Sequence, residues 1–309
     1  MGAQGFDRSW AGAPAHANLP AMSTPETSAA VPLAQRLPPQ LFFIVSAVFH
    51  YLGPACAVLL FGAVEVLGVA WLRIATAALV FALWRRPWRL WRRSSRADRW
   101  TLLGLGLVLA AMNGCFYLAI ARLPLATVGA IEFLGPIGLA AAGLRNQRNV
   151  VALSLAAAGV AMLTQIRLEG DALGYALAFA NAALFVAYIV LAHRIAGADG
   201  IDGLAASMLV ALVAISPVGL GPALPALTDP ALLLAGIGVG IASSVIPYVC
   251  DLLAMARLPR ASFALMLSLL PATATGIGVL VLGQIPSARD LTGIALVMAG
   301  VALHRSVRA

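Results

Sequence analysis

An isolated carboxylate lies within an apolar stretch that is long enough to cross a lipid bilayer. Glu132 is the only ionisable residue between Leu123 and Leu144. An ionisable side chain at the centre of a bilayer costs roughly 2.5–3.5 kcal/mol on insertion scales, so such residues usually face a partner or a water-filled cavity. The chemistry that suits Glu132 is binding of an ammonium group or exchange of a proton.

A basic residue lies at a matching depth in another apolar stretch. Arg73 and Glu132 each lie about eight residues, or about 12 Å of helix, from the outer ends of their predicted spans. Because two opposite charges at one depth can cancel each other's insertion cost, we predict that Arg73 neutralises or gates Glu132. A permanent structural ion pair is the alternative interpretation.

Other polar side chains recur at helical spacing inside the apolar stretches. His50 lies in the first of them, and since an unperturbed imidazole titrates near neutral pH, it suits proton coupling or substrate binding; a packed, hydrogen-bonded histidine is the alternative. The other side chains share helix faces, where they either line a cavity or join helices through hydrogen bonds. They are Asn113, Tyr117, Asn181, Tyr188, Ser244, Tyr248 and Asp251. Helix breaks for gating are predicted at Pro136, Pro247 and Pro271.

The composition requires a membrane to surround the elements that carry these residues. The chain is 61% hydrophobic and 10% charged, whereas a soluble domain has about 25% charged residues. Because a span takes about 20 residues, the chain after residue 40 has room for ten spans and no soluble domain. The predicted spans are 41–60, 65–84, 101–121, 124–144, 150–166, 171–192, 204–222, 231–251, 261–282 and 291–305.

Some of these boundaries depend on proline. The seventh span is expected to break at Pro217 and Pro222, and the third and fourth spans to separate at Arg122-Leu-Pro124. Residues 1–40 lack the charged and apolar regions of a secretory signal and are predicted to form a disordered cytoplasmic tail.

Arginines indicate the orientation of the spans. All 20 basic residues are arginine, and seven of them crowd residues 85–99, between the second and third spans. If that loop is cytoplasmic, 16 arginines lie inside and three outside, which satisfies the positive-inside rule and places both termini in the cytoplasm. The net charge of +8 then reports membrane orientation, and nucleic-acid binding through residues 85–99 is the weaker alternative.

The chain contains an internal repeat. An offset of 135 residues aligns residues 119–124 (AIARLP) with 254–259 (AMARLP), and Pro136 with Pro271. Each half then holds five spans, an odd number, so the second copy must be inverted in the membrane. Inverted repeats that meet at a midplane site are typical of secondary transporters. We therefore predict an all-α polytopic membrane protein of ten transmembrane helices, arranged as two inverted five-helix repeats over residues 41–166 and 167–309.

These residues resemble the EamA-type drug/metabolite transporter superfamily, and more closely its threonine/homoserine exporter branch. The resemblance runs from about residue 41 to 305 and implies a two-repeat carrier of the bacterial inner membrane that exports small amphiphilic metabolites such as amino acids, driven by a proton gradient. It departs from the family at Leu270 and Gln284, where a glutamate often stands. The matching motifs are residues 130–136 (AIEFLGP), 244–251 (SVIPYVCD), 256–259 (ARLP), 71–73 (WLR) and 86–90 (RPWRL).

The leading hypothesis is a secondary exporter in which Arg73 meets the substrate carboxylate and Glu132 its ammonium group. An exporter of hydrophobic drugs or cations is the rival within transport, and a non-transporting membrane scaffold or sensor is the rival from another class. No catalytic or nucleotide-binding motif favours an enzyme. We expect a small-molecule substrate, protons and the lipid bilayer as partners. A homodimer is compatible with the sequence. We expect no metal, cofactor or nucleic acid.

Overall fold

A computed structural model describes residues 37–135, 138, 147–164, 171–195, 200–255 and 269–303. These residues form helices joined by short connections and contain no strand. The helices all belong to one compact unit, Pro38–Ala309, and most of the predicted tail lies outside the described residues. They are α2 (Pro39–Leu60), α3 (Val66–Arg85), α4 (Trp88–Arg93), α5 (Arg96–Ile120), α6 (Leu125–Glu132), α8 (Gln147–Thr164), α9 (Ala172–Ile195), α10 (Gly200–Thr228), α11 (Pro230–Gly240), the π-helix η1 (Ile241–Val245), α12 (Ile246–Met255), α14 (Leu270–Leu282) and α15 (Ala288–Leu303).

Six helical segments within the described part of the chain are long and apolar enough to cross a membrane. A bilayer offers no water to backbone N–H and C=O groups, so an apolar segment satisfies them internally by forming a helix. The other predicted spans overlap the shorter helices α6, α8, α14 and α15. The chain is therefore a multi-pass helical membrane protein. The six segments are Pro39–Leu60, Val66–Arg85, Arg96–Ile120, Ala172–Ala192, Gly200–Thr228 and Pro230–Asp251.

The predicted break in the seventh span is wrong. Helix α10 runs without interruption from Gly200 to Thr228, with Pro217 and Pro222 inside it. Prolines are tolerated in membrane helices because neighbouring helices and side chains can satisfy the backbone groups that they free. Here α3 supports the region, since Trp71 Nε1 donates a hydrogen bond of 2.9 Å to Ser216 Oγ, one residue before the first proline.

The predicted separation of the third and fourth spans is confirmed. Helix α5 ends at Ile120, and α6 begins at Leu125 with Pro124 as its N-terminal flanking residue. Helix α6 is short, because it ends at Glu132 and a turn follows at Phe133. The carboxylate of interest therefore occupies the last position of a helix. Pro136 lies outside the described residues, as do residues 139–146.

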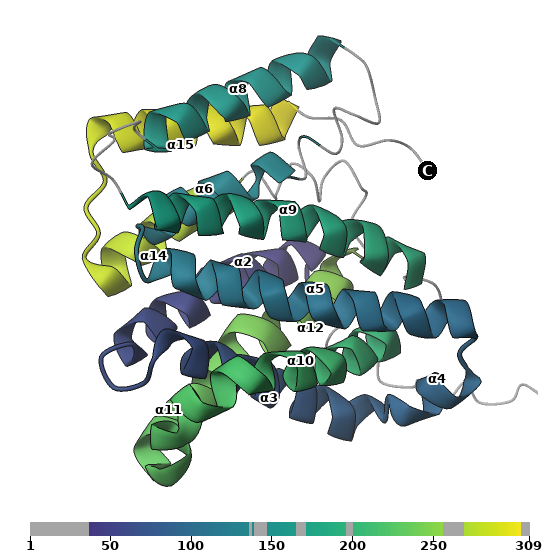
Figure 1. The fold of residues 1–309 in the computed structure, drawn as a ribbon. Coiled ribbons are helices and arrows are strands. Elements are labelled where there is room, and N and C mark those ends of the chain that lie inside the picture. The colour runs from purple at the N-terminus through teal and green to yellow at the C-terminus, as the bar shows by residue number, and fades with distance from the viewer. Residues whose placement is uncertain are drawn as a thin grey trace, which may run out of the picture. The chain divides into compact units, whose positions relative to one another are not determined.

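Three long helix pairings organise the described part of the chain (Figure 1). Helix α3 packs against α10, α5 packs against α9, and α8 packs against α15. The last pair approaches so closely that a Cβ added to Gly159 would clash with the carbonyl oxygen of Gly293, so glycine is required there. Helix α2 packs against both α12 and α14, which brings the first and last thirds of the chain together.

Candidate functional site

Arg73 joins α3 to the π-helix η1. Its side chain is buried, with 7% of the residue exposed. Nε donates to Ser244 Oγ at 2.9 Å, and Nη2 donates to the carbonyl oxygen of Ser243 at 3.0 Å. The guanidinium carbon also lies 5.4 Å from the centre of the Tyr117 ring on α5, which favours a cation–π interaction. Arg73 thus holds three membrane helices in one arrangement.

The local sequence explains why the carbonyl of Ser243 is available. In an α-helix this carbonyl would accept a hydrogen bond from the residue four positions later, which is Pro247. Proline has no N–H, so that bond cannot form. The surrounding turn is a π-helix, a local form that often marks functional sites. Pro247 therefore follows a π-helical turn, and the carbonyl that it cannot pair with is one that Arg73 binds.

Glu132 has a different partner from the one that the sequence suggested. The residue is 7% exposed, and its Oε1 accepts a hydrogen bond of 3.2 Å from Asn181 Nδ2 on α9. Arg73 acts on Glu132 electrostatically, but the two side chains form no ion pair. The alternative of a permanent structural ion pair is therefore wrong for this structure, because each charge forms its hydrogen bonds with neutral groups on another helix. That Arg73 neutralises or gates Glu132 stays a prediction.

Three buried polar atoms near these charges have no hydrogen-bond partner among the described residues. They are the hydroxyl oxygens of Tyr51 and Tyr117 and the Oδ1 of Asn181. Each of the three residues is 0% exposed. Buried polar groups in native proteins are nearly always hydrogen-bonded, so three unsatisfied atoms in one region indicate a candidate site for a polar ligand.

The sequence interpretation missed Tyr51. Its ring contacts α6, where a Cβ added to Gly129 would lie 3.1 Å from the Tyr51 hydroxyl oxygen, three residues before Glu132 in the chain. A tyrosine in an apolar span is ordinarily a packing residue, and no spacing distinguishes this one. The neighbouring His50 packs edge-on against the Tyr51 ring, with 5.2 Å between ring centres.

A second group of predicted residues lies on α9 and in the first two turns of α12. Tyr188 lies on α9, and its ring stacks on Phe185 with 5.9 Å between ring centres. Ser46 on α2 adjoins the carboxylate of Asp251 and donates to the carbonyl of Pro247. The ring of Tyr248 packs against Phe81 of α3, with 6.5 Å between ring centres.

Two predicted residues do not join these groups through any hydrogen bond. Asn113 is buried, but its Nδ2 donates to the carbonyl of Leu109 at 2.8 Å, within its own helix. Pro271 lies in the first turn of α14, where proline is well tolerated, so it marks the beginning of a helix among the described residues. Six elements contribute to the candidate site. The buried charges lie on α3 and α6, the unsatisfied polar atoms on α2, α5 and α9, and the helix break at η1.

Comparisons with known proteins assign the chain to a family. The model of the EamA-like transporter family matches residues 172–305. The threonine/homoserine exporter RhtA of Salmonella typhimurium (strain LT2) is 33% identical over 245 residues, which cover 78% of this chain and 81% of the relative. RhtA of Escherichia coli (strain K12) is 32% identical over 258 residues, covering 82% and 85%. The chain belongs to the EamA-like transporter family, in its threonine/homoserine exporter branch.

The fold agrees with this assignment. A crystal structure of another protein superposes on this EamA-like chain with a TM-score of 0.53 and 23% sequence identity, covering 86% of this chain and 95% of the other. The two curated relatives are named as exporters. The sequence resemblance to the EamA superfamily and to its threonine/homoserine exporter branch is therefore confirmed.

Gln284, one of the two departures from the family pattern, caps a helix. Its Oε1 accepts a hydrogen bond of 3.1 Å from the backbone N–H of Leu125, the first residue of α6. Pro124 supplies no side-chain cap, so this N–H would otherwise lack a partner. A glutamate would serve equally well beside a helix N-terminus. Gln284 thus joins α6 to the end of α14 and does not contact Glu132, which lies at the opposite end of α6.

Replacing Gln284 with alanine is expected to destabilise this EamA-like protein by about 0.5–2 kcal/mol, as the loss of a helix cap usually does. Gln284→Glu should keep the stability of the original, because a carboxylate oxygen can accept the same bond. Thermal unfolding in detergent measures both effects. Gln147→Ala is the control, because Gln147 is exposed at the start of α8. An equal loss in both alanine variants would contradict the capping role.

A second contact lies near the start of α6. Arg122 Nη1 donates to Asp171 Oδ2 at 3.0 Å, which joins the α5–α6 connection to the start of α9. The backbone N–H of Gly174 and then Arg122 hold the pKa of Asp171 below its usual value. Such an exposed pair contributes little stability, so it acts mainly to fix the relative position of the two segments.

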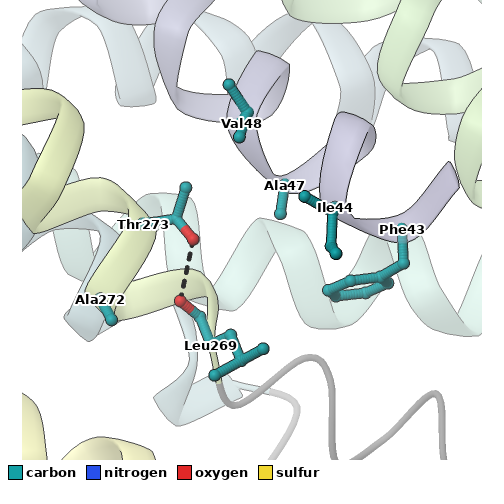
Figure 2. A pocket seen from close by; sticks show the side chains of 7 residues that line it. All are labelled: Phe43, Ile44, Ala47, Val48, Leu269, Ala272 and Thr273. Carbon is teal, nitrogen blue, oxygen red and sulfur yellow. Dashed lines mark hydrogen bonds between the residues drawn. The ribbon is translucent and has the colours of Figure 1, made fainter. Parts of the chain in front are cut away.

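An apolar groove of about 350 Å³ lies between α2 and α14 and is separate from the candidate site (Figure 2). Its one polar side chain, Thr273, donates a hydrogen bond to the carbonyl of Leu269 and so offers no free donor. None of the buried charges or orphan atoms lines it. The groove lacks the convergent polar groups that a binding site for a polar ligand needs. It is lined by Phe43, Ile44, Ala47, Val48, Leu269, Ala272 and Thr273.

Proposed function

We propose that this protein is a proton-coupled exporter of amino acids of the threonine or homoserine type, working by alternating access. The observation that carries the proposal is the buried group of unlike charges that do not pair with each other. Arg73 is a bidentate donor suited to a carboxylate, and Glu132 is an acceptor suited to an ammonium group. An amino-acid zwitterion presents both groups. The names of the RhtA relatives support the same substrate class.

The orphan polar atoms extend this proposed site. Asn181 Oδ1 is an acceptor beside Glu132, so it would share the ammonium group of the substrate. The hydroxyls of Tyr51 and Tyr117 can each donate one hydrogen bond and accept another, which suits the remaining polar atoms of the substrate. Tyr188, Tyr248 and Asp251 would form an approach to the site between α9 and α12.

The architecture that we propose is two inverted repeats of five spans. The first repeat would consist of α2, α3, α5, α6 and α8, and the second of α9, α10, α11–α12, α14 and α15. Exchanging each helix with its counterpart leaves the most extensive helix pairs unchanged. The pair α5–α9 becomes α12–α2, and α6–α9 becomes α14–α2. The pairs α3–α10, α6–α14 and α8–α15 map onto themselves. This two-fold pattern supports the duplication. From the distribution of arginines, the termini and the arginine-rich loop would lie in the cytoplasm.

The proposed cycle couples substrate binding to helix movement. A substrate carboxylate that binds Arg73 competes with Ser243 and Ser244 for the same N–H groups, so binding loosens the contact between α3 and η1. A proton that enters from outside and binds a Glu132 oxygen removes the negative charge that holds the ammonium group. The substrate then leaves outward, and release of the proton inward resets the carboxylate.

Efflux of preloaded radiolabelled threonine from proteoliposomes tests the proposal. A pH gradient, acidic outside, should accelerate efflux from vesicles that contain the protein and leave protein-free vesicles unchanged. Gradient-driven efflux of a hydrophobic dye without efflux of threonine would favour the drug exporter. A folded protein that moves neither compound would favour the scaffold or sensor.

A further inference from the structure

A compact arginine-rich surface surrounds the short helix α4, which the sequence interpretation treated as a loop. Four exposed arginines there have no side-chain partner among the described residues, and we call them the arginine face. Their neighbours are already engaged: Arg85 and Arg93 lie against Asp202, and Arg99 donates to the carbonyl of Trp91. The arginine face consists of Arg86, Arg89, Arg92 and Arg96.

The arginine face continues a lipid-facing surface on α3. Leu79 and Leu83 are exposed by 57% and 79%, as side chains that contact lipid tails would be. Trp84 follows, 53% exposed, and then Arg86 and Trp88. The exposed side chains therefore change from aliphatic to aromatic to cationic within ten residues along one helix end. Tryptophan prefers the headgroup level of a membrane, which places the arginine face at the level of lipid phosphates.

Helix α5 shows the same order in the reverse chain direction. Its first residue, Arg96, is exposed, Trp100 is 64% exposed, and Leu107 is 57% exposed. Two helices that run in opposite chain directions thus place their tryptophans and arginines at the same boundary. This agreement identifies the boundary as a membrane interface more firmly than either helix alone.

The fold holds the arginine face in place. Leu90 of α4 is buried against Leu102 of α5 and Ala206 of α10, so the short helix is anchored on its apolar side. A capping box formed by Ser95 and Asp98 fixes the start of α5 directly after it. The four guanidinium groups therefore extend from a supported scaffold, although α4 itself has only six residues.

The backbone at Arg86 is an independent indication of a role for this surface. Arg86 is the only residue other than glycine with a positive φ in the described part of the chain, with φ 52° and ψ 58°. It occupies the position after a helix end where glycine is usually found, because a Cβ disfavours this conformation. Strained residues of this kind cluster at functional sites. An arginine here keeps a cation where glycine would suit the backbone better.

We propose that the arginine face binds the phosphate headgroups of anionic phospholipids in the leaflet on this side of the membrane. Guanidinium groups bind phosphate oxygens bidentately, and clustered arginines beside a transmembrane helix attract anionic lipids. The arginine face is continuous with exposed leucine and tryptophan side chains. This favours a lipid over a free phosphate as the ligand, because a lipid also covers the apolar part of the surface.

Thermal unfolding of the purified protein in a zwitterionic detergent tests this proposal. Phosphatidylglycerol should raise the melting temperature by several degrees at a concentration where phosphatidylcholine and inorganic phosphate do not. The triple variant Arg89→Gln, Arg92→Gln, Arg96→Gln should lose most of that rise. Arg289→Gln is the matched control, since Arg289 is exposed near the start of α15 and should leave the response unchanged. A full response in the triple variant, or an equal response to inorganic phosphate, overturns the proposal.

Arg86→Gly separates a lipid-binding role from a purely structural one. Glycine relieves the left-handed conformation, so the variant should melt at a higher temperature than the original protein without lipid. If the arginine face binds phospholipid, the same variant should also respond less to phosphatidylglycerol. A stabilised variant with an undiminished lipid response would remove Arg86 from the site.

Discussion

Exchange of Glu132 for glutamine is expected to abolish stimulation of threonine efflux by a pH gradient while the protein remains folded. Glutamine has the same shape, and its carbonyl oxygen can still accept the hydrogen bond that Asn181 donates to Oε1. It carries no titrating group and no negative charge, so neither proton exchange nor a charged bond to an ammonium group survives. A hydrogen bond to a charged group is worth about 1.5–3 kcal/mol, which corresponds to roughly 10- to 150-fold weaker substrate binding.

The measurement for Glu132→Gln is efflux from proteoliposomes at several imposed pH gradients, with the amount of inserted protein matched. Glu65→Gln is the control, because Glu65 flanks the start of α3, is exposed and makes no capping hydrogen bond. It removes a carboxylate without touching the buried site, so its efflux should follow the original protein. If Glu132→Gln keeps the full response to the gradient, Glu132 is not the coupling group.

The sequence identified the two buried charges because charge is costly in a bilayer and rare in these spans. Glu132 and Arg73 stand out against apolar neighbours, and both are buried in the structure. Their partners were not predictable in the same way. The depth of a residue follows from counting along one helix, but its contacts depend on how the helices rotate and pack. Equal depth suggested a direct pair, whereas packing gave Arg73 to η1 and Glu132 to α9.

Span positions were predictable to the extent that the bilayer alone determines them. The predicted spans 41–60 and 65–84 correspond closely to α2 (Pro39–Leu60) and α3 (Val66–Arg85), since the apolar run sets the helix length. Proline was a less reliable guide. Pro124 begins a helix, and Pro247 loosens one beside a bound arginine, but Pro217 and Pro222 lie inside an unbroken helix. Whether a proline interrupts a helix depends on the contacts that neighbouring helices make with it, and the sequence alone does not show these contacts.

Tyr51 shows the same limit for neutral polar groups. Burying a tyrosine hydroxyl in a span costs little free energy if it finds a hydrogen-bond partner, so the presence of a tyrosine says little about function. It becomes informative only when the structure shows that the partner is missing. The site proposed from the sequence therefore contained the two charges and several polar residues, and it lacked Tyr51, whose unsatisfied hydroxyl lies against Gly129.

Arg73→Lys is expected to raise the concentration of threonine needed for half-maximal efflux by roughly 10- to 150-fold, the effect of losing one hydrogen bond to a charged group. Lysine keeps the positive charge, so this variant tests the guanidinium geometry. Nε and Nη2 bind Ser244 and Ser243 in two directions in this structure. A single ammonium group cannot reproduce that fork, either toward η1 or toward a substrate carboxylate.

Arg85→Lys is the matched control for Arg73→Lys, because it makes the same exchange on the same helix. Arg85 is partly exposed and contacts Asp202 through Nε at 2.6 Å, a pairing that a lysine can also form. Its efflux should therefore remain close to that of the original protein.

Loss of a buried hydrogen-bond partner costs about 1–3 kcal/mol of stability, so melting temperatures must accompany the efflux data for Arg73→Lys. If Arg73→Lys lowers the melting temperature but leaves the threonine dependence unchanged, Arg73 only joins α3 to η1, and the substrate carboxylate binds elsewhere.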